Sequence, residues 1–309
     1  MENNGIFLKK IFSNWWVPPL IMTILGFLLY GRALFFGFTY LDDNNLILGN
    51  QYFLANLANI FQSFLIDVFH LFNSSAFYYR PILTISLIFD YQIGGIYPFM
   101  YHLTNVILHI LSSYLIFVFL TKLRYRKPIS LIFAIIFLVH PVLTQAVAWI
   151  PGRNDSLLAI FVLATLIFFI DYLRGNKIGS LIWSLVFFSL ALFTKESAIL
   201  TIPIMIFYFY RFCDKSKRTA DKSYYFIGVV VLTGLWFTMR HIVLSGSPTT
   251  SLIDMIQSVY LNSPAVVQFI GKIFFPFNLS VLPVMQDTTF LYGIAAIILL
   301  VMLFIFTKI

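Results

Sequence analysis

Long apolar segments, separated by short polar breaks, follow one another along nearly the whole chain of 309 residues. A helix rises about 1.5 Å per residue, so about 20 apolar residues cross a hydrocarbon core about 30 Å thick. The pattern predicts an all-α polytopic membrane protein of about eight or nine transmembrane helices, organised as a single domain over residues 1–309. The expected spans begin near Val17, Phe99, Ile129, Ser156, Ile178, Ala198, Tyr224 and Thr289, and residues 265–283 form a weaker ninth candidate.

The composition agrees with membrane insertion. Hydrophobic residues make up 60% of the chain and charged residues only 10%, which is too apolar for the polar surface of a soluble domain. The first apolar run is longer than the core of a secretory signal peptide, so we expect a retained anchor. The single cysteine, Cys213, cannot form an intramolecular disulfide.

The net charge of +8 is a topology signal rather than an indication of nucleic acid binding. With a cytoplasmic N-terminus, fourteen of the twenty basic residues fall in cytoplasmic segments, as the positive-inside rule requires. We therefore expect this orientation in a bacterial inner membrane or an ER-type membrane. The fourteen are Lys9, Lys10, Lys122, Arg124, Arg126, Lys127, Arg174, Lys177, Arg211, Lys215, Lys217, Arg218, Lys222 and Lys308, and the other six are Arg32, Arg80, Arg153, Lys195, Arg240 and Lys272.

The first non-cytoplasmic loop, residues 39–98, is the longest polar break. Within it, apolar residues at helical spacing predict an amphipathic helix in the membrane interface, namely Leu54, Leu57, Ile60, Phe61, Phe64, Leu65 and Val68. The following apolar run is interrupted by Asp90 and a Gly-Gly pair, so we expect a second interfacial or half-inserted helix. A full span there would place the basic segment "KLRYRK" outside, against the charge bias.

Two adjacent carboxylates, Asp42 and Asp43, stand at the start of this loop in "FTYLDDNNLILGN". Adjacent helical residues diverge by about 100°, so one would face a substrate while the other supports it. A carboxylate near a low-dielectric boundary can have a raised pKa and act as a general base. The alternative is a solvated loop with a helix N-cap.

Further ionisable residues lie where later spans meet the same face. In "VHPVLTQAVAWIPGRND", Pro141 predicts a bend, and Asn154 or Asp155 an N-cap, with Asn154 the better candidate for that role. For Asp155 three other roles are open: orienting Arg153, coordinating a divalent ion with the acidic pair, or binding a sugar hydroxyl. Lys195 beside Glu196 forms either a phosphate site or a surface salt-bridged turn. Arg240, with His241 as a second donor, indicates either phosphate recognition or snorkelling to headgroups.

The segments "FTYLDDNNLILGN", "YYRPILTISLIFDYQIGGIYPFMYHLTNVILHIL", "LVHPVLTQAVAWIPGRNDSLLAI", "LALFTKESAILTIP" and "FIGKIFFPFNLSV" occur in this order. The series resembles the membrane half of TMTC-type protein O-mannosyltransferases and their bacterial relatives, within the GT-C glycosyltransferase superfamily. The resemblance covers about residues 17–285 and implies a GT-C-like helical bundle. The tetratricopeptide tail of TMTC proteins has no counterpart in this sequence, so the acceptor stays open.

The resemblance implies a polyprenyl-phosphate-linked sugar donor, an inverting transfer and a site on the non-cytoplasmic face. By similarity, Asp42 and Asp43 match the catalytic acidic pair, and Arg80 with Pro81 matches the start of a helix that lines the site. Lys195, Glu196 and Arg240 match positions that hold the lipid phosphate.

We therefore expect inverting glycosyl transfer to a hydroxyl acceptor, which is a protein, a glycan or a lipid. The donor phosphate is expected at Lys195, Arg240 and Arg153, with Arg80, Asp155, Glu196 and His241 in support. A Mg²⁺ or Mn²⁺ ion at Asp42, Asp43 and Asp155 is one way to meet the phosphate charge, and lysine and arginine alone are the other. A secondary transporter and a non-catalytic lipid-binding membrane protein are the alternative functions.

Overall fold

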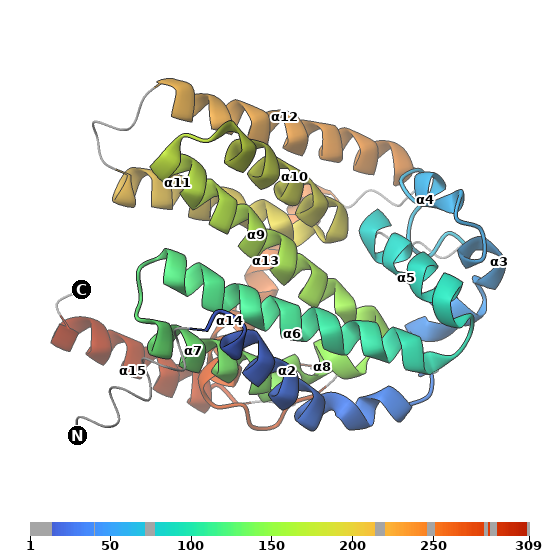
Figure 1. Ribbon diagram of the computed structural model, residues 1–309, viewed down its shortest axis with the longest axis horizontal. Coiled ribbons are helices and arrows are strands. Elements are labelled where there is room, and N and C mark those ends of the chain that lie inside the picture. The colour runs from blue at the N-terminus through green and yellow to red at the C-terminus, as the bar shows by residue number, and fades with distance from the viewer. Residues whose placement is uncertain are drawn as a thin grey trace. The chain divides into compact units, whose positions relative to one another are not determined.

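A computed structural model describes residues 14–39, 41–71, 78–213, 220–245, 251–280, 284 and 289–307. The predicted cytoplasmic residues Lys9, Lys10, Lys215, Lys217, Arg218 and Lys308 lie outside these ranges, as does the side chain of Lys222. All regular elements of the described ranges are helices, which confirms the all-α prediction (Figure 1).

The α-helices are α2 (Val17–Tyr30), α3 (Gln51–Leu54), α4 (Asn59–Gln62), α5 (Pro81–Gly94), α6 (Pro98–Lys122), α7 (Lys127–Val139), α8 (Thr144–Ala148), α9 (Arg153–Gly175), α10 (Ile178–Thr194), α11 (Thr201–Phe212), α12 (Ala220–Val243), α13 (Leu252–Asn262), α14 (Ala265–Phe274) and α15 (Leu291–Thr307). Shorter 3₁₀ or π turns are η1 (Gly31–Phe35), η2 (Asn44–Leu48), η3 (Pro141–Leu143), η4 (Ile150–Gly152) and η5 (Glu196–Leu200).

Four helical segments of the described residues are long and apolar enough to cross a membrane: Val17–Phe35, Pro98–Lys122, Ile150–Gly175 and Tyr224–Val243. The pair Lys127–Val139 and Pro141–Ala148, bent by 50° at the break, is either a fifth, broken span or a re-entrant loop. Proline lacks the N–H that would continue the helix, so the bend predicted at Pro141 is confirmed. The shorter apolar helices include α10, α14 and α15, and the number of spans remains a prediction.

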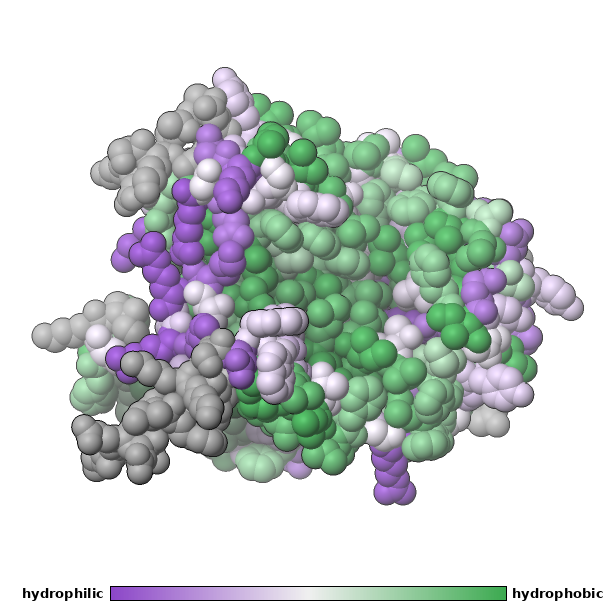
Figure 2. Space-filling view, viewed as in Figure 1, coloured by the Kyte–Doolittle hydropathy of each residue, from purple (hydrophilic) through white to green (hydrophobic). Residues whose placement is uncertain are grey.

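The first of two compact units comprises Met1–Val139 and Ala146–Ser247. In it α9 lies between α6 and α10 and packs on both (Figure 1). The largest buried apolar cluster includes Phe169, Tyr172, Phe188, Leu192 and Tyr225 from α9, α10 and α12. Figure 2 shows hydrophilic side chains gathered at the end where α6 and α9 finish, whereas apolar side chains cover the flank.

The second compact unit comprises His140–Gln145 and Pro248–Ile309. Its main packing is α14 against α15. Gly271 and Gly293 lie at this contact, where an added Cβ on either residue would clash with backbone atoms of the other helix. Glycine is therefore required for the close approach of these two helices. Whether the units act as one domain stays a prediction.

The outer loop differs from its predicted form. In place of one interfacial helix over residues 54–68, the chain forms the single turns α3 and α4. Asn56 Oδ1 accepts the N–H of Ala58 at 3.0 Å, and Asn59 Nδ2 donates to the Phe53 carbonyl at 2.8 Å. Asparagine side chains thus satisfy backbone groups locally and compete with a continuous helix.

The second predicted short helix is confirmed as α5. It begins at Pro81, whose fixed φ suits the first turn of a helix, and ends before Gly95, which has a φ of +57°. Its 14 residues rise about 21 Å, less than the hydrocarbon thickness of about 30 Å. This short helix brings Arg80 and Asp90 beside α6 and α9.

Candidate active site

The two acidic residues of the outer loop occupy different environments. Asp43 is only 1% exposed, and its Oδ2 accepts hydrogen bonds from the backbone N–H and the hydroxyl of Thr39 at 2.6 and 2.9 Å. Asp42 is partly exposed, and among the described residues its carboxylate takes no hydrogen bond. Asp43 is therefore held in place, whereas the lone pairs of Asp42 are available to a ligand.

Both carboxyl groups have pKa values above the ordinary value. Burial is the main cause for Asp42, the neighbouring charge of Asp43 adds to it, and the guanidinium of Arg80 partly opposes the rise. Burial also raises the pKa of Asp43, while the hydrogen bonds from Thr39 and the nearby His102 and Arg153 oppose it. The influence of Arg80 on Asp42 links the acidic pair to a group of cations.

Arg80, the residue before α5, is the first of these cations and forms an ion pair with Glu196. Its Nη2 lies 2.7 Å from Glu196 Oε1, and its Nε donates to Glu196 Oε2 at 3.3 Å. The guanidinium also lies over the Tyr78 ring, 4.3 Å from its centroid. Burial acts to raise the pKa of Glu196, but the hydrogen bonds and charge of Arg80, with the charge of Lys195, hold it below the ordinary value.

The beginning of α9 completes the group. Asn154 donates its side-chain amide to the Thr194 carbonyl at 3.1 Å and accepts from Arg80 Nη1 at 2.9 Å, in the amide orientation that satisfies both partners. The predicted N-cap role of Asn154 is wrong, because Gly152 is the N-cap and Asn154 lies inside the first turn. One residue further, Asp155 Oδ1 lies 2.5 Å from Lys195 Nζ.

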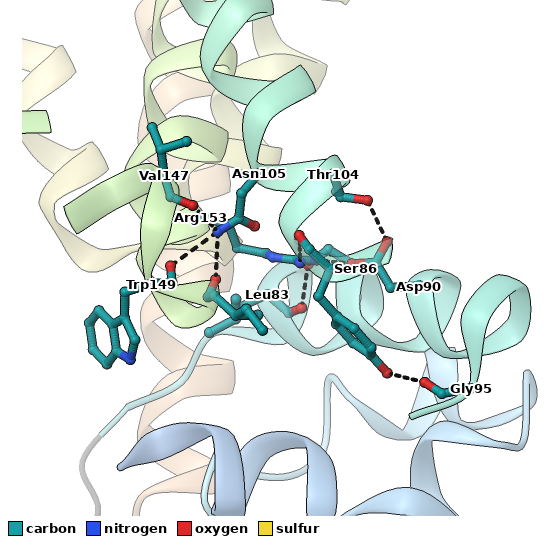
Figure 3. A network of polar contacts seen from close by, with 11 residues as sticks. Leu83, Ser86, Asp90, Gly95, Thr104, Asn105, Val147, Trp149 and Arg153 are labelled. Carbon is teal, nitrogen blue, oxygen red and sulfur yellow. Dashed lines mark hydrogen bonds and ion pairs between the residues drawn. The ribbon is translucent and has the colours of Figure 1, made fainter. Parts of the chain in front are cut away.

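Arg153 is enclosed in a separate buried network (Figure 3). Its Nη1 lies 2.6 Å from Asp90 Oδ2, and its Nη2 donates to the Tyr101 carbonyl at 2.9 Å. Arg153 is 0% exposed and Asp90 3% exposed. Thr104 donates to Asp90 Oδ1 at 2.6 Å. Arg153 therefore ties the start of α9 to α5 and α6, and its guanidinium does not face an open surface.

A second contact holds the same irregular segment in place. Asn105 Nδ2, on α6, donates to the carbonyls of Val147, Trp149 and Ile150 at 3.0 to 3.2 Å (Figure 3). These carbonyls lie at the end of α8 and at the start of η4, on the irregular path that leads into α9. One buried amide thus fixes the path that leads to Arg153, Asn154 and Asp155.

Arg240 and His241 lie in the last turn of α12. The Arg240 guanidinium is 6.0 Å from the centroid of the Trp236 ring, and no described acid forms an ion pair with it. Trp236 is buried in the same apolar cluster as Tyr79, the residue before Arg80, and Phe193, two residues before Lys195. The structure thus brings the end of α12 toward this region without direct contact between Arg240 and Lys195.

An apolar groove of about 750 Å³ runs between α11 and α12. On one side its lining extends from Ile199, in η5, along α11 to Tyr210, and on the other side along α12 from Phe226 to Phe237. Ile199 follows Glu196 by three residues, and Trp236 in the groove wall precedes Arg240 by one helical turn. The groove therefore begins beside the charged residues and continues along the apolar length of the helices.

The carboxylates do not form a three-ligand metal site. Among the described residues, no group of three or more His, Cys, Asp or Glu side chains could hold an ion together. Asp155, expected as a third ligand beside Asp42 and Asp43, pairs with Lys195 instead. Because Mg²⁺ is commonly held by one or two carboxylates together with water and substrate phosphates, a divalent ion at Asp42 and Asp43 stays a prediction.

Sequence reasoning did not single out His102, Asn105 or the partner of Arg153. In the sequence, Asp90 interrupts an apolar run, and an ionisable residue within such a run is itself a signal of a functional or structural partner. His102 and Asn105 are polar residues buried on the apolar helix α6, at 1% and 0% exposure. Polar residues within an apolar helix are candidates for a structural or functional role, but the sequence does not indicate which groups they contact.

The sequence of this chain is similar to known glycosyltransferases. A family model described as dolichyl-phosphate-mannose-protein mannosyltransferase matches residues 85–243, from within α5 to the end of α12. These residues include Arg153, Lys195 and Arg240 and follow Asp42 and Arg80 in the chain. No solved structure matches the chain.

Curated relatives agree with the family model. Protein O-mannosyl-transferase Tmtc1 of Drosophila melanogaster is 32% identical over 177 residues, which are 57% of this chain and 20% of the relative. Protein O-mannosyl-transferase TMTC3 of Homo sapiens is 33% identical over 187 residues, 58% of this chain and 20% of the relative. The matched part thus spans about a fifth of these relatives. Since the family model covers more than half of the sequence, this chain belongs to the dolichyl-phosphate-mannose-protein mannosyltransferase family.

Proposed function

We propose that this protein is an inverting glycosyltransferase that moves mannose from a polyprenyl-phosphate donor to a hydroxyl acceptor on the non-cytoplasmic membrane face. Family membership supports sugar transfer, and the names of the relatives support mannose and an O-linked product. One structural observation carries the proposal. Asp42 has a raised pKa, takes no hydrogen bond from the described residues, and lies within electrostatic reach of Arg80.

The donor phosphate binds at the cations around the start of α9. Arg80 and Lys195 are paired with Glu196 and Asp155 in the structure, and a phosphate offers these cations equivalent acceptors. Arg240, without an acidic partner among the described residues, adds a third positive charge from α12. The isoprenoid tail lies in the apolar groove between α11 and α12, which begins beside these residues.

Arg153 has a positioning role in this proposal. Its guanidinium is enclosed with Asp90 and the Tyr101 carbonyl, so it does not bind the phosphate directly. It acts by holding the first turn of α9, which carries Asn154 and Asp155, in position. His241, exposed at the end of α12, is a second donor near the headgroup region.

The transfer step follows from these positions. The acceptor oxygen attacks the anomeric carbon, the bond from that carbon to the phosphate oxygen breaks, and the acceptor proton passes to the Asp42 carboxylate. The leaving phosphate gains one negative charge, which the nearby cations stabilise in the transition state. Attack opposite the leaving group inverts the anomeric configuration. Asp43, fixed by Thr39, keeps Asp42 basic through its charge.

The full chain in liposomes, supplied with polyprenyl-phosphate mannose and a hydroxyl-bearing peptide, tests this proposal. We expect Asp42→Asn to reduce mannose transfer about 10²- to 10⁴-fold, as the loss of a general base does. Asp67→Asn is the matched control, because among the described residues its carboxylate interacts only with its near neighbours in the same loop, the Phe69 N–H and His70. Full activity in Asp42→Asn would refute the base assignment, and donor binding without turnover in the wild type would favour a lipid-binding function instead.

A further inference from the structure

A second cavity lies at the opposite ends of the helices that form the candidate active site. It measures about 540 Å³, and the ends of α6, α9 and α11 line it. The 23 residues of α9 rise about 35 Å, so the two regions are separated by the full length of that helix. In the orientation predicted from charge, this cavity opens at the cytoplasmic face.

Two arginines form the polar part of the wall, Arg124 after α6 and Arg174 at the end of α9. Arg174 Nη1 donates to the Lys122 carbonyl at 2.7 Å, which holds its guanidinium at the cavity. Lys122 itself is neutralised, with its Nζ 2.6 Å from Asp171 Oδ1. Among the described residues no acid forms an ion pair with Arg124 or Arg174, so this part of the wall is cationic.

The rest of the wall is apolar and aromatic and includes Phe119, Phe207, Tyr208 and Phe212. Phe207 and Phe212 are 64% and 60% exposed on α11, a helix that lies along the apolar flank of the unit. Exposed aromatic residues on such a flank face the acyl chains of a membrane. The cavity therefore joins a cationic end to a surface that lipid can enter, which favours an amphiphilic ligand over a soluble anion.

The backbone at Arg124 provides an independent observation. The N–H groups of Arg124 and Tyr125 donate to the carbonyls of Thr121 and Leu120 at 3.0 and 3.1 Å, the hydrogen bonds of a Schellman helix end. The first of these residues has a φ of +71°, where glycine is strongly preferred. An arginine thus occupies a position for which the helix end favours a residue without a side chain.

Helix dipoles and membrane topology explain basic residues at these helix ends, but they do not explain a hollow with aromatic walls between two arginines. Basic pockets between helices on the cytoplasmic side are suited to anionic lipid headgroups. We propose that this cavity binds an anionic glycerophospholipid, with its phosphate at Arg124 and Arg174 and one acyl chain along α11.

The test uses the purified full chain in a nonionic detergent, with melting followed by tryptophan fluorescence. The probes are phosphatidylglycerol, phosphatidylcholine with the same acyl chains, and inorganic phosphate. We expect saturating phosphatidylglycerol to raise the Tm by about 4 °C, as tight binding to the folded state does, and the other two probes to leave it unchanged. An equal rise with phosphatidylcholine, or with inorganic phosphate, would overturn the proposal.

The Arg124→Gly variant separates lipid binding from folding. Glycine suits the backbone at this position, so we expect the variant to melt at or above the wild-type temperature without lipid. Because the guanidinium is gone, its response to phosphatidylglycerol should disappear. Arg126→Gln removes a charge from the same turn but not from the cavity wall, and it should keep the response. A lipid response retained in Arg124→Gly would overturn the assignment.

Discussion

The buried pair of Arg153 and Asp90 offers a quantitative test of how α9 is positioned. Asp90→Asn keeps the size of the side chain and an oxygen that can accept from Thr104, but it removes the negative charge 2.6 Å from Arg153 Nη1. The guanidinium, which is 0% exposed, then loses its ion-pair partner, because its remaining hydrogen bonds go to the neutral Ser86 hydroxyl and Tyr101 carbonyl and the Asp43 charge acts on it only from nearby.

Removing one partner of a buried ion pair costs about 3–5 kcal/mol of the free energy of unfolding. For a chain of this size we expect the Tm to fall by about 6–10 °C. The pair of Lys122 and Asp171 also anchors α9, here to α6, but its side chains are about one-third exposed, so it is the matched control. We expect Asp171→Asn to cost about 1 kcal/mol or less.

The assay is thermal unfolding of the purified full chain, with mannose transfer measured on the same samples. The double variant Asp90→Asn/Arg153→Met removes both charges, and we expect it to recover most of the lost stability. Equal losses in Asp90→Asn and Asp171→Asn would contradict the reasoning from burial. If the double variant is stable but does not transfer mannose, the result would instead favour the role in phosphate binding that the sequence predicts for Arg153.

Other predictions concern the site and the packing. Asp155→Asn removes the acidic partner of Lys195, so we expect the KM for the donor to fall by about threefold, and an unchanged KM would contradict the proposed exchange of carboxylate for phosphate. Mannose transfer should decline as the pH falls through the raised pKa of Asp42, because the protonated acid cannot accept the acceptor proton; the rate against pH should therefore bend above the ordinary aspartate value of 3.8. Gly293→Ala places a methyl group against a backbone carbonyl of α14 and should destabilise its unit by about 1–3 kcal/mol in a thermal melt. The control Gly234→Ala, on α12 with open space around its Cβ position, should be neutral or stabilising.

Parts of the fold could be predicted because they depend on neighbouring residues. The apolar length of α6, the break before Pro141 and the end of α5 at Gly95 each follow from local chemistry. The prediction of an interfacial helix over residues 54–68 is wrong, and the reason is also local. Its apolar spacing was correct for a helix, but Asn56 and Asn59 bind the backbone in competing turns.

The candidate site was predictable as a set of residues but not as a set of contacts. Ionisable groups next to membrane-length apolar segments are costly, so Arg80, Lys195 and Glu196 could be selected from the sequence. Their ion pairs could not be predicted, because Arg80 and Glu196 are 116 positions apart and the sequence offers several other acids as partners for Arg80. Likewise, the sequence placed Arg153 with the phosphate-binding residues, whereas the fold encloses it with Asp90.

The sequence by itself determined the membrane character, the expected orientation and the residues able to do chemistry, because hydropathy and charge are properties of the residues themselves. Only the tertiary structure decided which carboxylate of the acidic pair is available. Burial and hydrogen bonds from Thr39 hold Asp43, while Asp42 stays open near Arg80. These differences arise from the packing of separate segments around each group, and packing sets the solvation and the partners that control its reactivity.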